Sequence, residues 1–355
     1  NVRDWCGFVG EWRESVKELR FGAAFDLNKD FEYFSSLEKI SLDAREDGFH
    51  VSGGMLYKDR ANEASELVAA PRRLAPGGEI AVENCIVSAN VLYRNEAKKV
   101  TFRNVSAVEY HAAQEALFEE VVFEGTGECI VRSNAFADCQ NLRSFTAEEG
   151  AEVSLESMAL SGEMENFKTL TLTNGFGQVA YDAVSGNPAF EGYELAAGCN
   201  KFAVVNGLLF EGGNVRIPAA WKGGTLAVPD GITSLYVTTD AGERFIDELI
   251  LGKDISALTL NNVRFRNIGI NGQNAAFAVK DGVLYTADMH TLVLFPSSRT
   301  GTFEVPDTVE TIAPYAFYGS AVYVVHLPAG LTEIGAYAFA DSELTGIEIP
   351  AGVLQ

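Results

Sequence analysis

Residues 305–350 read VPDTVETIAPYAFYGSAVYVVHLPAGLTEIGAYAFADSELTGIEIP, and this stretch decides the fold. Apolar residues followed by proline recur at intervals of 22 residues, twice in succession: Val305-Pro306, Leu327-Pro328 and Ile349-Pro350. An isoleucine and an Ala-Phe pair return at the same interval: Ile312 and Ile334, Ala316-Phe317 and Ala338-Phe339. A fixed period of this length is typical of repeat proteins, in which one repeat buries its apolar residues only by stacking on its neighbours.

A short segment with apolar first, fourth and sixth residues recurs outward from this stretch along the chain. It occurs at 37–42, 97–102, 118–123, 142–147, 167–172, 190–195, 246–251, 265–270, 322–327 and 344–349. Of the 30 residues between the apolar positions, 14 are charged, against 21% for the whole chain. Such alternation buries one face of a β-strand and leaves the other in water. It predicts parallel strands stacked in one long sheet, with Leu37, Ile40, Leu42, Leu344, Ile347 and Ile349 inward and Lys98 and Glu248 in solvent.

A second motif interrupts the strands in three places. Its copies each begin seven residues after the last apolar residue of a strand: Phe49–Tyr57, Phe202–Phe210 and Phe277–Tyr285. A turn and a return arm follow each copy and end at Pro71, Pro218 or Pro296. Short β-rich arms around a turn that contains glycine predict β-hairpins inserted between the repeats.

These motifs resemble the BspA-type (Treponema-type) bacterial leucine-rich repeat. The resemblance is carried by the pattern V-P-x-x-V-x-x-I-x-x-x-A-F at 305–317, by the strand at 344–350 and by the Asp-Gly-Val-Leu-Tyr hairpin at 281–285. It implies a leucine-rich-repeat solenoid that is β-rich, formally α/β, with irregular outer segments. It also implies an exported bacterial surface protein, since members of this family are typically found there and some act in adhesion.

We expect residues 1–355 to form a single solenoid, with an N-terminal helical cap at 1–24 and repeats at 25–355. Trp12, Val16 and Leu19 have the i, i+4, i+7 spacing of an amphipathic helix, which predicts a helix over 8–20. A partner-binding role for this helix is the alternative. Because the Phe of each Ala-Phe pair faces the core, Phe317 and Phe339 should both be buried.

Composition excludes some classes of partner. The chain has 27 basic and 49 acidic residues, a net charge of −22 and a pI of about 4.6. It lacks the surplus of Lys and Arg that nucleic acids and anionic membranes attract. Its apolar runs are far shorter than the roughly 20 residues that span a bilayer. We therefore predict no nucleic-acid partner and no membrane insertion of this fragment. The start at Asn1 suggests a mature or trimmed chain whose signal peptide or lipid anchor was removed, and an intracellular fragment is the alternative. The extracellular or cell-surface location is what the family resemblance implies.

Residues that could carry chemistry are scattered. The four histidines (His50, His111, His290, His326) and five cysteines (Cys6, Cys85, Cys129, Cys139, Cys199) show no metal-ligand spacing, and no catalytic motif occurs. We predict no catalytic residue, no metal site and no cofactor. The acidic pairs Glu119-Glu120 and Asp247-Glu248 raise the alternative of a polysaccharide-active solenoid enzyme, which needs two carboxylates facing each other across a sugar. Acidic residues in a groove beside aromatic side chains would favour that alternative.

The least charged stretch of the predicted sheet contains Tyr323, Val324 and His326, and Thr345 and Glu348 lie on the neighbouring strand. Because aromatic side chains anchor interfaces, these five residues are the predicted contact with a protein or glycan ligand, host-derived ligands included. The alternative is that Tyr323 only covers the next repeat, with the contact at the hairpins around Tyr57, Phe210 and Tyr285. The predicted function is non-enzymatic extracellular binding or adhesion, and a structural spacer or stalk is a further alternative.

Overall fold

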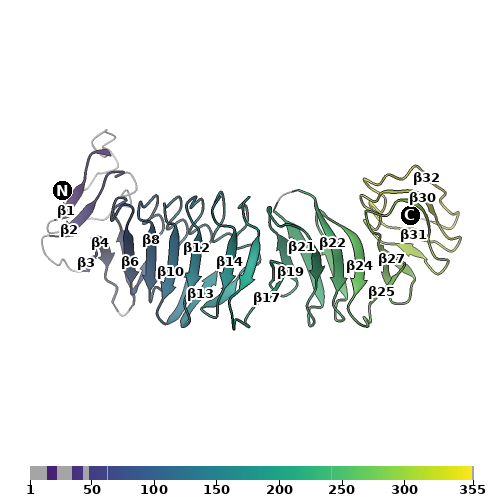
Figure 1. Cartoon of the computed structure of the whole chain (residues 1–355), viewed down its shortest axis with the longest axis horizontal. Coiled ribbons are helices and arrows are strands. Elements are labelled where there is room, and N and C mark those ends of the chain that lie inside the picture. The colour runs from purple at the N-terminus through teal and green to yellow at the C-terminus, as the bar shows by residue number, and fades with distance from the viewer. Residues whose placement is uncertain (1–13, 22–33, 43–47, 62, 241, 354–355) are drawn as a thin grey trace. The chain divides into compact units, whose positions relative to one another are not determined.

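The computed structural model describes residues 14–21, 34–42, 48–61, 63–240 and 242–353. Within these ranges the backbone forms 32 β-strands and no α-helix (Figure 1). The chain divides into two compact units, Asn1–Gly207 with Pro218–Trp221 and Leu208–Ile217 with Lys222–Gln355. Each unit is a solenoid whose coils stack through parallel strands. That residues 1–355 form one single solenoid stays a prediction.

The coils of the first unit carry strands in two alternating sets. One set comprises β1 (Glu18–Phe21), β2 (Lys39–Leu42), β6 (Glu79–Glu83), β8 (Lys99–Arg103), β10 (Glu120–Glu124), β12 (Ser144–Ala147), β14 (Thr169–Leu172) and β16 (Gly192–Leu195). The other comprises β3 (Phe49–Ser52), β4 (Met55–Lys58), β5 (Ser65–Ala69), β7 (Cys85–Val87), β9 (Ala107–Val108), β11 (Gly127–Val131), β13 (Ala151–Leu155) and β15 (Phe176–Val179). β17 (Ala203–Val205) follows them in the chain.

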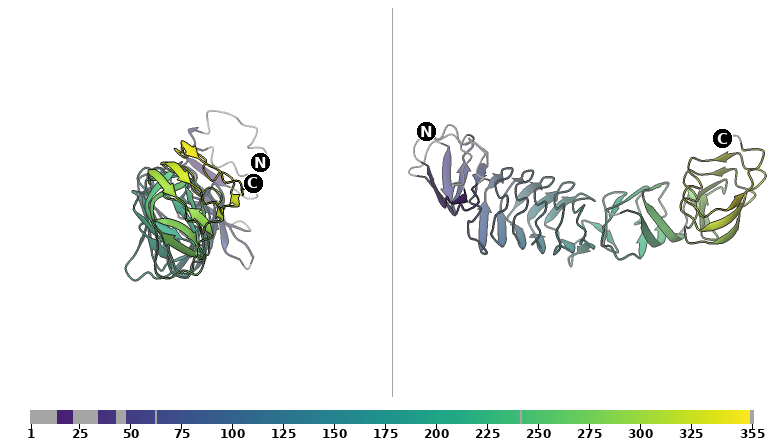
Figure 2. Two further views of the ribbon diagram at one scale, coloured as in Figure 1. Left: turned by 90° about the vertical axis from the view of Figure 1, so that its right-hand side faces the viewer. Right: turned by 90° about the horizontal axis from the view of Figure 1, so that it is seen from above.

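The second unit is built in the same way, as Figure 2 shows in two further views. One set of strands comprises β20 (Thr225–Ala227), β22 (Arg244–Leu251), β24 (Val263–Ile270), β28 (Gly301–Glu304), β30 (Val322–His326) and β32 (Gly346–Ile347). The other comprises β19 (Asn214–Ile217), β21 (Ser234–Thr239), β23 (Ala257–Leu260), β25 (Phe277–Lys280), β26 (Val283–Thr286), β27 (Thr291–Leu294), β29 (Thr311–Ile312) and β31 (Glu333–Ile334). β18 (Leu208–Phe210) begins the unit.

The ten predicted strands are confirmed as β2, β8, β10, β12, β14, β16, β22, β24, β30 and β32, and their pairing is parallel. The prediction of one long sheet is wrong, because these strands are divided among five separate sheets. Two of the breaks, between β2 and β6 and between β24 and β28, fall where a hairpin is inserted. The outer segments are also more regular than expected, since several form a second parallel set such as β7-β9-β11-β13-β15.

Burial follows the predicted alternation. Of the 30 apolar positions in the ten predicted segments, 23 are buried. The seven others are Leu42, Leu195, Ile270, Leu327, Leu344, Ile347 and Ile349. The first three directly precede the hairpin motifs, where regular stacking is interrupted. The last three belong to the final coil, so the predicted inward position of Ile349, which is 51% exposed, is wrong. Lys98 is exposed as predicted and Glu248 is half-buried.

Two of the predicted hairpins lie within a single unit, and both are confirmed. β3 pairs antiparallel with β4, and β25 with β26. Each return arm, β5 or β27, pairs antiparallel with its hairpin on one side. On its other side the arm pairs parallel with the next coil, through β7 or β29. The hairpin is therefore an extra loop that returns the chain to the regular stack.

The predicted helical cap is wrong over the part of 8–20 that the structure describes. Residues Glu18–Phe21 form β1, which pairs parallel with β2, Leu19 lying opposite Ile40. Leu19 and Phe21 are buried, whereas Glu18 and Arg20 are exposed, and this alternation is that of a strand. The position of Leu19 fits both the spacing of an amphipathic helix and the alternation of a strand. This segment forms a strand because it pairs with β2. Trp12 and residues 8–13 lie outside the described residues.

Phenylalanine rings fill the coil interior in stacked rows. Phe102 stacks on Phe123 at a ring distance of 4.8 Å in the first unit. In the second unit Phe317 lies between Phe295 at 4.6 Å and Phe339 at 4.9 Å. Phe317 is fully buried, as predicted, but Phe339 in the final coil is only half-buried. The repeat position is therefore a core position only where coils pack on both sides of it.

The outer turns are held together by left-handed backbone positions. Pairs four residues apart adopt φ values near +60°: Asn134 and Asp138, Tyr315 and Gly319, Tyr337 and Asp341. The N–H groups of the first two pairs donate to carbonyls of the next coil, for example that of Asn134 to the carbonyl of Met158 at 3.0 Å. Asn, Asp and Gly enter this region with little strain, but it is an uncommon conformation for tyrosine.

Candidate binding surfaces

The β30 face consists of Tyr323, Val324, His326, Thr345 and Glu348, and the fold brings all five predicted site residues together. β30 pairs with β32 so that Val324 lies opposite Gly346 and Val325 opposite Ile347. This register places Thr345 beside Tyr323 and Glu348 beside His326. Tyr323 is 44% exposed, Val324 is half-buried and the other three side chains are exposed.

Backbone bonds fix this face more firmly than side-chain contacts do. The N–H and Oγ1–H groups of Thr345 both donate to the carbonyl of Tyr323, at 2.9 and 3.0 Å. His326 Nε2 lies 3.6 Å from Glu304 Oε1 on β28, and both side chains are largely exposed. An exposed pair of this kind contributes little to stability. The Tyr323 ring is therefore presented on a rigid strand, in a form that suits an interface anchor.

The hairpin residues proposed as an alternative contact are core residues. Tyr57, Phe210 and Tyr285 are 4%, 6% and 1% exposed. Burial raises the pKa of Tyr57 and raises that of Tyr285 to about 12. These three rings are buried in the core, so they do not offer a surface to a ligand.

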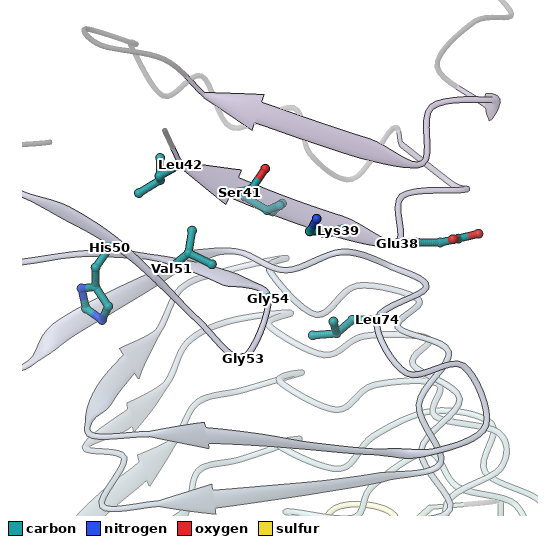
Figure 3. A pocket seen from close by; sticks show the side chains of 10 residues that line it. Glu38, Lys39, Ser41, Leu42, His50, Val51, Gly53, Gly54 and Leu74 are labelled. Carbon is teal, nitrogen blue, oxygen red and sulfur yellow. The ribbon is translucent and has the colours of Figure 1, made fainter. Parts of the chain in front are cut away.

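A pocket of about 1000 Å³ lies between β2 and the β3–β4 hairpin (Figure 3). Its charged side chains do not converge, since Glu38 and His50 point away from each other at opposite ends of it (Figure 3). His50 Nδ1 lies 2.7 Å from Asp59 Oδ1, and its ring stacks on Tyr57 at 5.1 Å. Lys39 pairs with Glu18 at 2.9 Å. These groups stabilise the hairpin and the first coils, and they do not assemble a site.

Sequence reasoning missed a pair of exposed tyrosines on the outer turns of the second unit. Tyr315 and Tyr337 are 51% and 67% exposed, and their rings stack at 5.3 Å with an interplanar angle of 15°. Tyr318 meets Tyr315 edge-on at 6.0 Å. The signal was present in the repeat, because a tyrosine directly precedes both Ala316-Phe317 and Ala338-Phe339.

The described cysteines are buried or half-buried, and the described titratable side chains form no metal site. Cys85, Cys129 and Cys139 are buried free thiols, and burial raises the pKa of each to about 12. Cys199 is half-buried, and Cys6 lies outside the described residues. In the described part of the chain no three His, Cys, Asp or Glu side chains are placed to share a metal ion. Nor do the described residues include a helix long and apolar enough to cross a membrane.

The repeats match a known family. The family model of the BspA type leucine-rich repeat region matches residues 87–202 and 293–355, with 6 copies. Among solved structures, the chain is similar to the pneumococcal vaccine antigen PcpA, with 14% identity and a TM-score of 0.34 over 86% of this chain and 71% of that one.

Two further bacterial structures are similar to the chain. A leucine-rich cell surface protein from Faecalibacterium prausnitzii has 13% identity and a TM-score of 0.38, over 86% of this chain and 77% of that one. A leucine-rich repeat protein from Bacteroides ovatus has 15% identity and a TM-score of 0.32, over 96% and 80%. No curated protein matches the chain significantly.

Proposed function

The chain belongs to the BspA-type leucine-rich repeat family, and we propose that it is a non-enzymatic protein that binds a protein or a glycan through its repeats. The observation that carries this proposal is the β30 face. An aromatic ring, Tyr323, stands 44% exposed on a strand whose backbone is fixed by both neighbours, β28 and β32. Tyrosine is among the residues enriched at the energetic centres of protein interfaces, so this ring is a suitable anchor.

The binding takes place outside the cell or at its surface. Support comes from the family itself, whose members are typically exported surface proteins, some of them acting in adhesion. Ligands in that setting include proteins and glycans of a host. Antibody labelling of intact cells that carry the gene tests this location, and labelling only after lysis would contradict it.

Ion pairs between coils support the non-enzymatic part of the proposal. Glu119, one of the acidic pair considered for glycosidase chemistry, pairs with Lys98 at 3.2 Å and Arg143 at 3.4 Å. Asp247 pairs with Arg266 at 3.0 Å. Carboxylates engaged by cations of neighbouring coils hold the stack together and are not poised to protonate or attack a glycosidic bond.

The test is a binding screen with a matched pair of variants. The purified chain is applied to an array of extracellular-matrix proteins and glycans, and the affinity for any positive partner is then measured in solution. The double variant Tyr323→Ala, His326→Ala should keep its thermal midpoint and lose at least about 10-fold in affinity, the range expected of an interface anchor. Tyr110→Ala is the control, because Tyr110 is 48% exposed but lies in the first unit.

Three results would contradict the proposal. Unchanged affinity of the double variant for an identified partner would remove the β30 face as the contact. Absence of any partner on the array, together with release of reducing sugar from a polysaccharide panel, would favour the enzyme. Absence of both would favour the spacer or stalk.

A further inference from the structure

A cleft of about 710 Å³ opens within the second unit, where regular stacking breaks. β23 is the edge strand of its sheet, and the β25–β26 hairpin intervenes before the next outer strands. The cleft is lined on one side by Leu258–Phe265, which cover most of β23 and the start of β24. On the other side it is lined by β27 with Phe295 and by the outer turn at 313–318. Its volume lies in the range of about 300–1,000 Å³ that is usual for sites of small ligands.

Tyr315 forms an aromatic wall of this cleft. Its ring stacks on Tyr337, which does not line the cleft, and its orientation is therefore fixed from outside. Tyr318, also in the lining, meets Tyr315 edge-on. Half of the Tyr315 side chain is in solvent, so the ring offers a preorganised apolar surface without itself being needed to fill the core.

Both tyrosines stand at a left-handed position of the outer turn. Tyr315 has a φ of +59° and Tyr337 one of +57°. At the equivalent place before Ala135-Phe136 the chain uses Asn134, at a φ of +59°. Asparagine adopts this conformation more readily than tyrosine. His111 and Met158 take the same place in other coils, at φ values of +57° and +60°, so the turn imposes this conformation on several kinds of side chain. At the two tyrosines it leaves stacked rings exposed, where a ligand can reach them.

Polar groups on the opposite side of the cleft are held in position. The side-chain amide of Asn261 donates to the Tyr236 hydroxyl at 3.1 Å, which leaves its carbonyl oxygen able to accept a further bond. Asn262 and Thr259 are exposed in the lining. Arg264 pairs with Glu243, donates from Nη1 to the Gly319 carbonyl at 2.9 Å and lies 5.6 Å from the Tyr318 ring centre.

The few charged residues in the lining of the cleft indicate which class of ligand it can bind. The chain carries −22, yet no Asp or Glu is among the residues that line this cleft. The one charged side chain of the lining, Arg264, is already paired with Glu243. Asp341 accepts a hydrogen bond from Tyr318, which raises the pKa of that tyrosine, and so is engaged at the rim. A lining of amides, hydroxyls and ring faces without free charge matches a neutral ligand with many hydroxyl groups.

We propose that this cleft binds a neutral oligosaccharide, with one sugar ring stacked on Tyr315 and its hydroxyls bonded by Asn261 and Asn262. Sugar rings present an apolar C–H face and a rim of hydroxyls, which are the two chemistries that the cleft offers. The sugar is bound without being cleaved, because hydrolysis needs two carboxylates across the bond and none lines the cleft. The inference rests on the proposed function as a binding protein and adds a site apart from the β30 face.

A peptide added as a strand to the edge of β23 is the competing occupant. β23 spans four residues, Ala257–Leu260, so it offers a shorter edge than the usual strand of about 5–6 residues. The exposed tyrosines have no role in such backbone pairing. The observations therefore favour the oligosaccharide, and the peptide becomes an outcome of the test.

The experiment uses the whole chain and a panel of neutral gluco-, manno-, galacto- and xylo-oligosaccharides of six units, with binding measured by titration calorimetry. Tyr315→Asn should weaken binding by about 10-fold, the upper end of the range for an aromatic contact, with the thermal midpoint unchanged or raised. Tyr315→Phe keeps the ring and should stay within about threefold of the native affinity. Tyr110→Ala, at an exposed tyrosine of the first unit, should leave oligosaccharide binding unchanged.

Each outcome decides between the two proposals. The proposal that the cleft binds a neutral oligosaccharide is overturned if no such oligosaccharide binds. It is also overturned if Tyr315→Asn and the native chain bind with equal affinity. If a partner from the matrix array binds and the double variant Tyr323→Ala, His326→Ala weakens that binding, the proposed function stands while the cleft proposal fails. A peptide library member whose binding is lost on Leu260→Pro but kept in Tyr315→Asn would replace the sugar by an added strand.

Discussion

Truncation of Phe317 tests the view that rings stacked between coils hold the second unit together. Phe317 is 0% exposed and contacts three other rings, Phe295 at 4.6 Å, Phe339 at 4.9 Å and Phe303 at 6.2 Å. Removing a fully buried ring loses its transfer free energy and leaves a cavity that neighbouring coils fill only partly. Phe317→Ala should therefore lower the free energy of unfolding by about 3–5 kcal/mol.

Phe339→Ala is the matched control, because it removes the same ring from the same repeat position 22 residues later. Phe339 is only partly buried, so part of its ring is already in water and its truncation should cost less, about 2–3 kcal/mol. Urea unfolding of both variants, followed by circular dichroism and by hydrogen exchange of the Val325 amide, gives the two values. Equal costs, or a larger cost for Phe339→Ala, would refute the reasoning that packing on both sides decides the core.

Three further predictions concern single residues. Gly319→Ala should lower the free energy of unfolding by about 1–3 kcal/mol, because alanine rarely adopts its φ of +59° and the new Cβ would displace the Arg264 guanidinium; an unchanged melting temperature would contradict this. Burial raises the pKa of Tyr285 from 10.0 to about 12, so its stabilising contribution is present below pH 10 and is lost as pH rises toward 12. Urea midpoints across that range should fall less steeply for Tyr285→Phe than for the native chain. Cys139, whose pKa burial raises to about 12, should resist iodoacetamide at pH 8 in the folded chain, whereas the half-buried Cys199 should react first, as peptide mapping would show.

The strands and hairpins were predictable because their signals are local. Alternation at Leu37, Ile40 and their counterparts records which face of a strand is buried, whatever the strand pairs with. The spacing of the hairpin motif after Leu42 and Ile270 located both hairpins that lie within one unit. Grouping of Tyr323 and His326 with Thr345 and Glu348 also followed from the 22-residue period, since residues one period apart meet on adjacent parallel strands.

The sequence by itself therefore determined the coil, its inward residues and the β30 face, because a fixed period and alternating burial can be read without knowing the neighbours. Only the tertiary structure decided features that depend on what packs against a residue. Leu19 became part of a strand because β2 pairs with it, and Phe339 is half-buried because no coil of the described chain packs beyond it. The cleft beside Tyr315 exists because the hairpin breaks the stacking next to β23, and no local pattern records such a break.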